Sequence, residues 1–271
     1  MQQLQWKTAF VTGGSRGIGR GIVLKLADSG VRKIAINYLS NDAAAGETAR
    51  KLEDRGAEAI LVKGDIGKPA DVERMFATIR SAFGGSLDIF VHSARPNPGP
   101  WLAAPMEVTP EGLHQAFDTA AVAMTLACQH CVPLMPDGGR IIGVTYAPGG
   151  RTGSWQVWLA MGGGKAAMES TIRYFAVALA KKGITVNAVS PNTVDDSVLN
   201  ALPDPVYKGI KLWNESGWTP AGRMGTPADI GNAVALLCAE EASFITGQTI
   251  HVDGGASLMN SDLPLDIQGA G

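Results

Sequence analysis

A glycine-rich turn near the start of the chain constrains its fold more than any other feature. The run Val11-Thr12-Gly13-Gly14-Ser15-Arg16-Gly17-Ile18-Gly19 follows an apolar segment and precedes an amphipathic one, which indicates a strand, a tight turn and a helix start. Gly13 allows a sharp turn, and Gly17 and Gly19 let backbone N–H groups approach a pyrophosphate without interference from a Cβ. The turn therefore predicts a dinucleotide-binding βαβ unit.

The rest of the chain alternates between strand-like apolar runs and helical patterns. Apolar runs that indicate strands occur at Thr8–Val11, Lys33–Tyr38, Ala59–Lys63, Leu87–His92, Arg140–Thr145, Thr185–Ser190 and Gln248–Val252. Helical patterns lie between them at about 18–29, 42–55, 69–83, 110–135, 163–182 and 227–240. Because such alternation requires crossover helices, we expect an α/β single-domain Rossmann fold, a seven-stranded parallel sheet with helices on both faces.

Composition and charge exclude several function classes. The chain has 271 residues, a net charge of −2 and a pI near 6.1, so it lacks a basic field for nucleic acid. Met1 to Phe10 does not have the layout of a signal peptide, and no apolar run is long enough to span a membrane. Cys128 and Cys131 lie in an apolar helical segment, so we interpret them as core thiols. We expect a cytoplasmic protein with no metal site, nucleic-acid partner or membrane partner.

Further motifs, in the expected order, make the chain similar to the short-chain dehydrogenase/reductase superfamily over nearly its whole length. They are Gly64-Asp65-Ile66, Lys165 at the start of a long helix, the strand Ile184 to Pro191, and the ending Thr246-Gly247-Gln248 to Val252-Asp253-Gly254-Gly255. The resemblance implies that Asp65 and Ile66 hold the adenine, that Lys165 holds the nicotinamide ribose, and that the last strand supports a homotetramer or homodimer. We expect the domain to span residues 1–257, with a substrate lid at about 192–224 and a C-terminal extension over 258–271.

The residues after the second predicted strand indicate which nicotinamide cofactor the chain takes. NAD enzymes usually place an acid there to accept a hydrogen bond from the ribose 2′-hydroxyl, but Ile36 to Asn41 contains none. Arg16 can instead pair with a 2′-phosphate to which Ser40 and Asn41 can donate, so NADPH is favoured over NADH. The expected cofactor-binding residues are Gly13, Ser15, Arg16, Gly17, Ile18, Gly19, Asn37, Ser40, Asn41, Asp65, Ile66, Ser93, Ala94, Lys165, Pro191 and Thr193.

The chain departs from this family at all three residues of the usual catalytic apparatus. Met161 stands four residues before the lysine, where family members have a tyrosine. Tyr146 aligns with the usual serine, and Ala120 aligns with the usual asparagine. Reduction of a ketone forms an alkoxide that needs a proton at once, and a methionine cannot provide one. The sequence therefore argues against an ordinary ketoreductase.

Short motifs resemble the enoyl-(acyl-carrier-protein) reductases instead. They are Phe90-Val91-His92-Ser93, Thr145-Tyr146, Met161-Gly162-Gly163-Gly164-Lys165 and Thr219-Pro220-Ala221-Gly222-Arg223-Met224. That branch places its tyrosine seven residues before the lysine, where this chain has Trp158. Hydride addition to an activated C=C bond gives an enolate, which needs hydrogen-bond donors but can take its α-carbon proton later from water. We therefore predict an NADPH-dependent reductase of an enoyl thioester or an unsaturated biosynthetic intermediate.

The residues expected to carry this chemistry are Tyr146, Lys165 and Trp158. Tyr146 is the expected donor to the enolate, and a nearby Lys165 should lower the pKa of its phenol. The lid is rich in apolar and aromatic residues, which suits a small-molecule substrate of medium size, an acyl thioester among the candidates. Two other functions stay open: a non-catalytic nucleotide-binding partner subunit or sensor, and a carbonyl or imine reductase with Tyr146 as a relocated acid.

Charged residues in two loops bear on the same site. Asp195 and Asp196 follow the sixth predicted strand, where carboxylates would repel a pyrophosphate unless they face solvent. Arg95 stands where the family has a glycine after the fourth strand. It can offset these carboxylates, bind an anionic substrate group, or lie in solvent.

Overall fold

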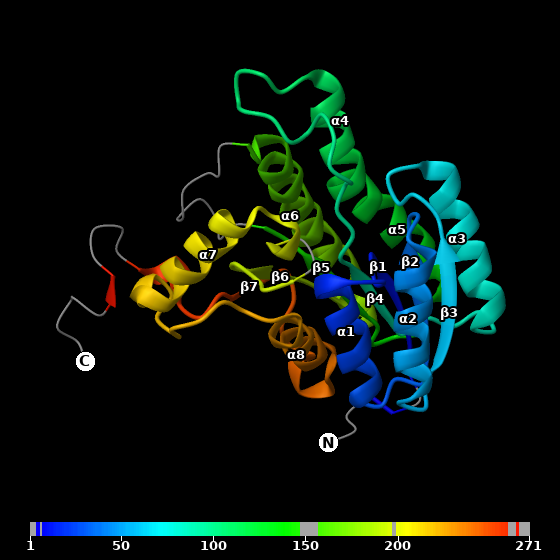
Figure 1. Cartoon of the computed structure of the whole chain (residues 1–271). Helices are drawn as coiled ribbons and strands as arrows, with labels where there is room; N and C mark the ends of the chain where they lie inside the picture. The colour runs from blue at the N-terminus through cyan, green and yellow to red at the C-terminus, as the bar shows by residue number, and fades with distance from the viewer. Residues whose placement is uncertain (1–3, 6, 147–156, 197–198, 260–263, 266–271) are drawn as a thin grey trace.

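A single parallel sheet forms the centre of the computed structural model, which describes residues 4–5, 7–146, 157–196, 199–259 and 264–265 (Figure 1). Within that part of the chain, seven strands pair in the order β3-β2-β1-β4-β5-β6-β7. Their bounds are β1 Thr8–Thr12, β2 Lys33–Tyr38, β3 Glu58–Lys63, β4 Ile89–His92, β5 Arg140–Val144, β6 Thr185–Pro191 and β7 Thr249–Val252. The predicted Rossmann fold with a seven-stranded parallel sheet is confirmed.

Helices cover both faces of this sheet (Figure 1). The first face packs against α1 (Gly17–Asp28), α2 (Asp42–Glu53) and α8 (Pro227–Cys238). The second face packs against α3 (Pro69–Ala82), α5 (Ala123–Cys131) and α6 (Leu159–Leu179). The remaining helices described are α4 Pro110–Phe117 and α7 Asp204–Trp213, the π-helical segments η1 Asp118–Val122 and η5 Asn214–Trp218, and the 3-10 turns Val132–Leu134, Ala180–Lys182, Leu199–Ala201, Glu240–Ala242 and Ala256–Leu258.

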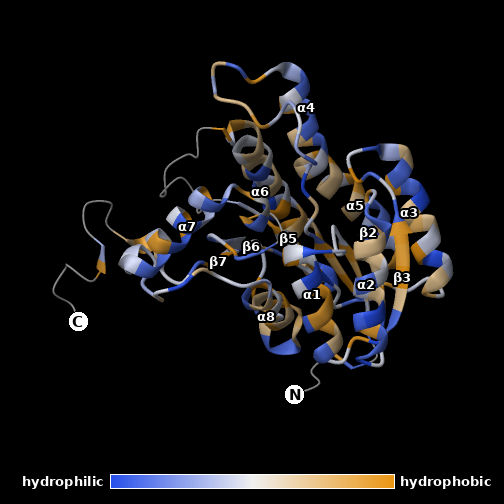
Figure 2. Cartoon of the chain, in the orientation of Figure 1, coloured by the Kyte–Doolittle hydropathy of each residue, from blue (hydrophilic) through white to orange (hydrophobic). Residues whose placement is uncertain are grey.

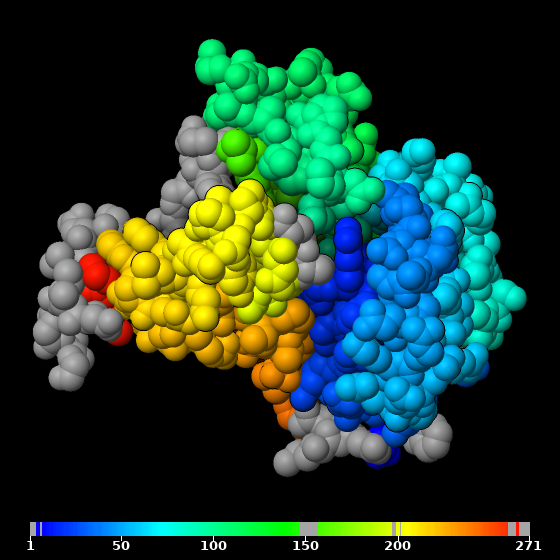
Figure 3. Space-filling view, viewed as in Figure 1, coloured from blue at the N-terminus to red at the C-terminus, as the bar shows by residue number. Residues whose placement is uncertain are grey.

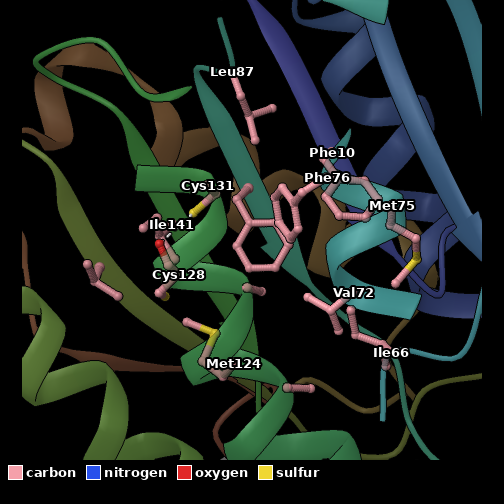
Figure 4. Packing of buried hydrophobic residues seen from close by; sticks show 14 of the residues in the cluster. Phe10, Ile66, Val72, Met75, Phe76, Leu87, Met124, Cys128, Cys131 and Ile141 are labelled. Atoms are coloured by element: carbon pink, nitrogen blue, oxygen red, sulfur yellow. Dashed lines mark hydrogen bonds between the residues drawn. The ribbon is translucent and has the colours of Figure 1, made fainter. Parts of the chain in front are cut away.

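The larger hydrophobic cluster lies between the sheet and α3, α5 and α6, and Figure 4 shows part of it. The rings of Phe10 and Phe76 meet edge to face there, with centroids 5.4 Å apart. Cys128 and Cys131 are fully buried in the same cluster with free thiols, so the prediction of core thiols is confirmed. Burial raises the pKa of the Cys131 thiol, which keeps it protonated.

The segment predicted as a lid, residues 192–224, contains a helix that the sequence analysis did not predict. Residues 204–213 form α7, whose Val206, Ile210 and Trp213 recur at helical spacing. Pro205 lies in the first turn of this helix, where its missing N–H is not needed, so it starts the helix instead of breaking it. The helix buries none of its residues, and Figure 2 shows both hydrophobic and hydrophilic residues along it. The described lid therefore presents an amphipathic helix at its surface.

A glycine lets α4 and α6 approach closely beside the site. A Cβ on Gly164 would lie 2.9 Å from the carbonyl oxygen of Ala116, whereas a Cβ on Gly162 would meet no atom within 4 Å. We predict that Gly164→Ala lowers the free energy of unfolding by about 1–3 kcal/mol, because the two helices must move apart. The control Gly162→Ala should be neutral or raise it by up to about 1 kcal/mol, since alanine favours a helix. Urea unfolding measures both, and equal losses would contradict this account.

Candidate active site

The glycine-rich turn lies where the strand order of the sheet reverses. β1 pairs with β2 on one side and with β4 on the other, and open α/β sheets bind ligands at such a switch point. Gly13 has a φ of +65°, and a Cβ there would lie 2.9 Å from the Cα of Ala94, so the two loops touch. α1 begins at Gly17, and its first backbone N–H groups are available to an anion. Figure 3 shows the deep blue atoms of this region in a groove between the yellow lid and the lighter blue α2 region.

Asn37 shapes this turn through its own hydrogen bonds. Its Oδ1 accepts from the N–H of Gly13 at 3.3 Å, and its Nδ2 donates to the carbonyl oxygens of Val62 and Gly64 at 3.2 and 2.9 Å. Its own carbonyl oxygen accepts from the N–H of Gly14 at 3.0 Å. These bonds give Asn37 a structural role at the end of β2, and its contact with a cofactor stays a prediction.

The other expected adenosine-binding residues lie around the same end of the sheet. Arg16 and Ser40 are exposed at the ends of β1 and β2. Asn41 caps α2 by accepting from the N–H of Ala44 at 2.9 Å, which uses its oxygen and leaves the amide N–H groups as donors. Asp65 accepts from the N–H of Gly67, whereas the side chain of Ile66 is buried in the core, so only the backbone of Ile66 can face a cofactor.

His92 at the end of β4 joins three elements, a role that the sequence analysis did not assign. Its Nε2 lies 2.9 Å from the carbonyl oxygen of Thr119, which can only accept, so Nε2 carries the hydrogen. Its Nδ1 then accepts from the Thr12 hydroxyl at 2.9 Å. Thr12 Oγ1 in turn accepts from the N–H groups of Ser93 and Ala94, each at 3.1 Å. The sequence signal that could have indicated this role is a histidine at the end of an apolar strand, directly before Ser93.

Burial determines the charge of His92. The side chain is fully buried, and this desolvation, with a smaller effect of the Lys165 charge, lowers its pKa to about 3. Thr119 belongs to the π-helical segment η1, and π-helical turns often occur at functional sites. His92 is therefore a neutral link between the glycine turn and the helix that carries Ala120.

Lys165 lies in a buried position under the end of β5. Its Nζ donates to the carbonyl oxygen of Val144 at 2.8 Å, and its side chain is 4% exposed. Burial lowers the pKa of Lys165 to about 8, and Glu169, one helical turn later, acts in the opposite direction. The hydroxyl of Thr145 donates to the carboxylate of Glu169. The contact of Lys165 with a ribose stays a prediction.

Tyr146 and Trp158, two expected catalytic residues, lie together in an aromatic cluster. Their ring centroids are 4.8 Å apart, and Trp158 also meets Trp101 edge-on at 6.1 Å. Trp101 and Met161 are both buried in this cluster. Met161 therefore occupies the position from which family members donate a proton, and its thioether lies in one cluster with the indoles of Trp101 and Trp158.

The expectation that Lys165 lowers the pKa of Tyr146 is wrong. Burial raises the pKa of the Tyr146 phenol, and the ammonium of Lys165 is bonded to the Val144 carbonyl oxygen. The phenol therefore keeps its proton at neutral pH. A neutral phenol is a hydrogen-bond donor, so Tyr146 can still stabilise a negative oxygen although its pKa is raised and not lowered.

The loop after β6 is held inward by its own contacts. The Tyr207 hydroxyl donates to Asp195 Oδ2 at 3.3 Å, and the N–H of Asp195 donates to the carbonyl oxygen of Gly225 at 2.8 Å. The Thr193 carbonyl oxygen accepts from the N–H of Gly225 at 2.9 Å. Asp195 thus connects the loop to α7 rather than facing solvent. Residues 197 and 198 of the predicted lid, and most of the predicted extension, lie outside the described residues.

Comparison with known proteins identifies the family. A family model described as Enoyl-(Acyl carrier protein) reductase matches residues 13–257. The chain belongs to the short-chain dehydrogenase/reductase family. Tetrahydroxynaphthalene reductase PfmaG of Pestalotiopsis fici is 35% identical over 92% of this chain and 91% of its own length.

Two further relatives show what this short-chain dehydrogenase/reductase is similar to. 1-Cyclohexenylcarbonyl-CoA reductase of Streptomyces collinus is 32% identical over 93% of this chain and 88% of its own length. The solved structure of angucycline C-6 ketoreductase LanV with bound NADP has a TM-score of 0.84 and 36% identity, and covers 95% of this chain and 98% of its own. The chain is an oxidoreductase, and these relatives support a reductase.

The described residues hold no group of three or more His, Cys, Asp or Glu side chains placed to bind a metal ion. Their helices include none that is long and apolar enough to cross a membrane.

The neutral state of His92 predicts a specific pH dependence of stability. The folded protein protonates His92 only near pH 3, whereas the unfolded chain does so near 6.5, so the unfolded state binds more protons between these values. The contribution of His92 is therefore present above about pH 6.5 and is lost as the pH falls toward 3. We expect His92→Asn to reduce the loss of unfolding free energy between pH 7 and pH 4 by about 3 kcal/mol. Urea unfolding measures this, with the exposed His114→Asn as control, and equal pH dependence in both variants would contradict it.

Proposed function

We propose that this protein is an NADPH-dependent reductase of an activated C=C bond, in an enoyl thioester or an unsaturated biosynthetic intermediate. The observation that carries this proposal is Met161, which is buried at the position of the family's proton-donating tyrosine. A ketone reductase needs an acid as the alkoxide forms. An enolate needs only hydrogen-bond donors until water supplies a proton to its α-carbon. The residues present suit the second reaction.

The residues of the switch-point crevice fit a dinucleotide phosphate. The glycine turn brings the α1 N-terminus to the crevice, and the exposed Arg16 and Ser40 flank the end of β2. The guanidinium of Arg16 can pair with a 2′-phosphate, and NADP is bound in the similar LanV structure. When bound, NADPH supplies the hydride. Lys165 is proposed to hold the nicotinamide ribose from the end of β5.

Tyr146 and Trp158 are proposed to stabilise the substrate oxygen. The neutral phenol of Tyr146 donates a hydrogen bond to the carbonyl oxygen as negative charge develops on it, and the indole N–H of Trp158 is the second donor. One such donor typically contributes ~2.7–4 kcal/mol to transition-state stabilisation. The close packing of the two rings limits their motion, which favours a preorganised donor pair.

The lining of the site supports a flat or conjugated apolar substrate. Tyr146 and Trp158 are partly buried rings packed against the cluster of Met161 and the buried Trp101, and the predicted lid carries the stacked rings of Trp213 and Trp218, whose centroids are 4.4 Å apart. Two relatives are named for cyclic substrates, one as a tetrahydroxynaphthalene reductase and the other as a 1-cyclohexenylcarbonyl-CoA reductase. We therefore place α,β-unsaturated thioesters and cyclic enones first among the candidates.

The test is turnover with a panel of substrates. NADPH oxidation is followed with enoyl-CoA thioesters, cyclic enones, imines and ketones, and binding of NADPH and NADP⁺ is measured in parallel. Faster reduction of the unsaturated substrates supports the proposal. Faster reduction of ketones or imines would contradict the proposal and favour a carbonyl or imine reductase in which Tyr146 donates the proton. Binding without any turnover would favour the non-catalytic partner subunit.

Tyr146→Phe should lower kcat with an unsaturated substrate at least about tenfold and leave NADPH affinity nearly unchanged. The phenol acts on charge that develops in the transition state, so its loss appears in kcat. The complementary variant Met161→Tyr should not improve C=C reduction, but it should introduce weak ketone reduction by restoring an acid. Steady-state kinetics and NADPH titration measure both, and full activity of Tyr146→Phe would remove this role.

We propose that the protein assembles as a homodimer or homotetramer through the β7 edge of the sheet. β7 is the last strand of the sheet, and Phe244, Leu236 and Leu258 near it are large apolar side chains with exposed surface. Exposed apolar patches beside an open strand edge commonly mark interfaces. Phe244→Glu with Leu236→Glu should reduce the mass measured by light scattering, whereas Met106→Glu in a distant exposed loop should not. A monomeric wild-type protein would exclude the assembly.

A further inference from the structure

Two arginines stand on the two sides of the switch-point crevice. Arg16 lies in the turn after β1, and Arg95 follows β4, the neighbouring strand. The loops that carry them touch, because a Cβ on Gly13 would lie 2.9 Å from the Cα of Ala94. The crevice between these loops is where an open α/β sheet holds its ligand. Family members have a glycine at the position of Arg95, so this second cation is a feature of this chain.

Arg95 is not a solvated loop arginine. Its side chain is partly buried, and its Nη1 donates to the carbonyl oxygen of the adjacent Pro96 at 3.2 Å. Burial and the positive charge of Arg16 lower the pKa of Arg95, and the carboxylate of Asp196 acts in the opposite direction. The charges of Arg16 and Asp196 therefore both act on Arg95. An arginine stays charged even so, because its ordinary pKa is far above neutral.

Two positive charges at one crevice favour an anion beside them. The exposed Arg16 acts on the partly buried Arg95 and lowers its pKa, so the two guanidiniums repel each other. The N-terminus of α1 at Gly17 adds further positive potential at the same place. Asp196 offsets only part of this charge. A ligand with two separate phosphate groups would give each guanidinium its own partner.

We propose that Arg95 binds the pyrophosphate of the dinucleotide from the β4 side of the crevice, while Arg16 binds the 2′-phosphate. The glycine turn holds the same pyrophosphate from the β1 side through its N–H groups. The inference deepens the proposed function, on which it rests for the identity of the cofactor. The positive charge of Arg95 would also offset the negative charge of Asp196, which otherwise disfavours a pyrophosphate nearby.

The two arginines should then differ in what their loss does. The pyrophosphate is common to NADPH and NADH, so Arg95→Gln should weaken both by a similar factor, roughly ten- to a hundredfold. The 2′-phosphate is present only in NADPH, so Arg16→Ala should weaken NADPH by a similar factor and leave NADH nearly unchanged. Arg95→Lys should recover part of the affinity because it keeps the charge without the planar fork.

The experiment measures binding to the whole protein by calorimetric titration, without turnover. The probes are NADPH, NADH, ADP, which carries a diphosphate without a 2′-phosphate, and 2′-AMP, which carries only the 2′-phosphate. We expect Arg95→Gln to weaken NADPH, NADH and ADP but not 2′-AMP, and Arg16→Ala to weaken NADPH and 2′-AMP but not ADP. Circular dichroism and thermal unfolding establish that each variant is folded, and Arg95→Lys guards against a packing effect.

Several results would overturn the inference. Unchanged affinity of Arg95→Gln for NADPH, NADH and ADP shows that Arg95 does not bind the cofactor. If the variant leaves these affinities unchanged but weakens binding of coenzyme A, titrated as a fifth probe, the anion belongs to a thioester substrate. Loss of NADPH alone would make Arg95 a second ligand of the 2′-phosphate. Because none of these readouts requires a reaction, a failure of the proposed C=C reduction would leave this test intact.

Discussion

The hydrogen bond between the Thr12 hydroxyl and His92 links the ends of the two paired strands on which the candidate site depends. β1 carries the glycine turn and β4 carries the loop with Ser93, Ala94 and Arg95, and the crevice exists because these strands are neighbours with diverging connections. A neutral imidazole can make this link because it accepts at Nδ1 while it donates at Nε2 to Thr119. The same bond network places the π-helical segment η1, and with it Ala120, beside the site.

The rest of the site shows how this chain arranges donors without the family's tyrosine. Met161 is packed against Trp101, so the position is filled by apolar contacts rather than left open to water. Burial lowers the pKa of Lys165 and raises the pKa of Tyr146, and both changes disfavour the charged form of the group. The resulting site contains a neutral phenol beside an indole, which suits stabilisation of an enolate better than rapid protonation of an alkoxide.

The crevice gathers charged groups, whereas burial around Tyr146 and Lys165 disfavours charge. In the crevice, the chain gathers Arg16, Arg95 and the α1 N-terminus around one place, with Asp196 as a partial counter-charge. Such an arrangement is costly while the charges face one another and favourable once phosphates lie between them. Under the two proposals, the cofactor phosphates bind at the crevice and the substrate oxygen binds beside Tyr146, so binding and chemistry use different parts of the site.

The sequence by itself determined the fold and the position of the crevice. Glycine spacing and alternating apolar runs are local signals that predict the strands and helices, and a parallel sheet allows few arrangements of these elements. The sequence also showed that Met161 stands where the family has its tyrosine. It could not show that α7 forms within the lid, that His92 bridges Thr12 and Thr119, or that Tyr146 keeps its proton. Those features depend on which side chains become buried together and on contacts between residues far apart in the chain, and desolvation and hydrogen bonding are set only when the tertiary structure brings them into contact.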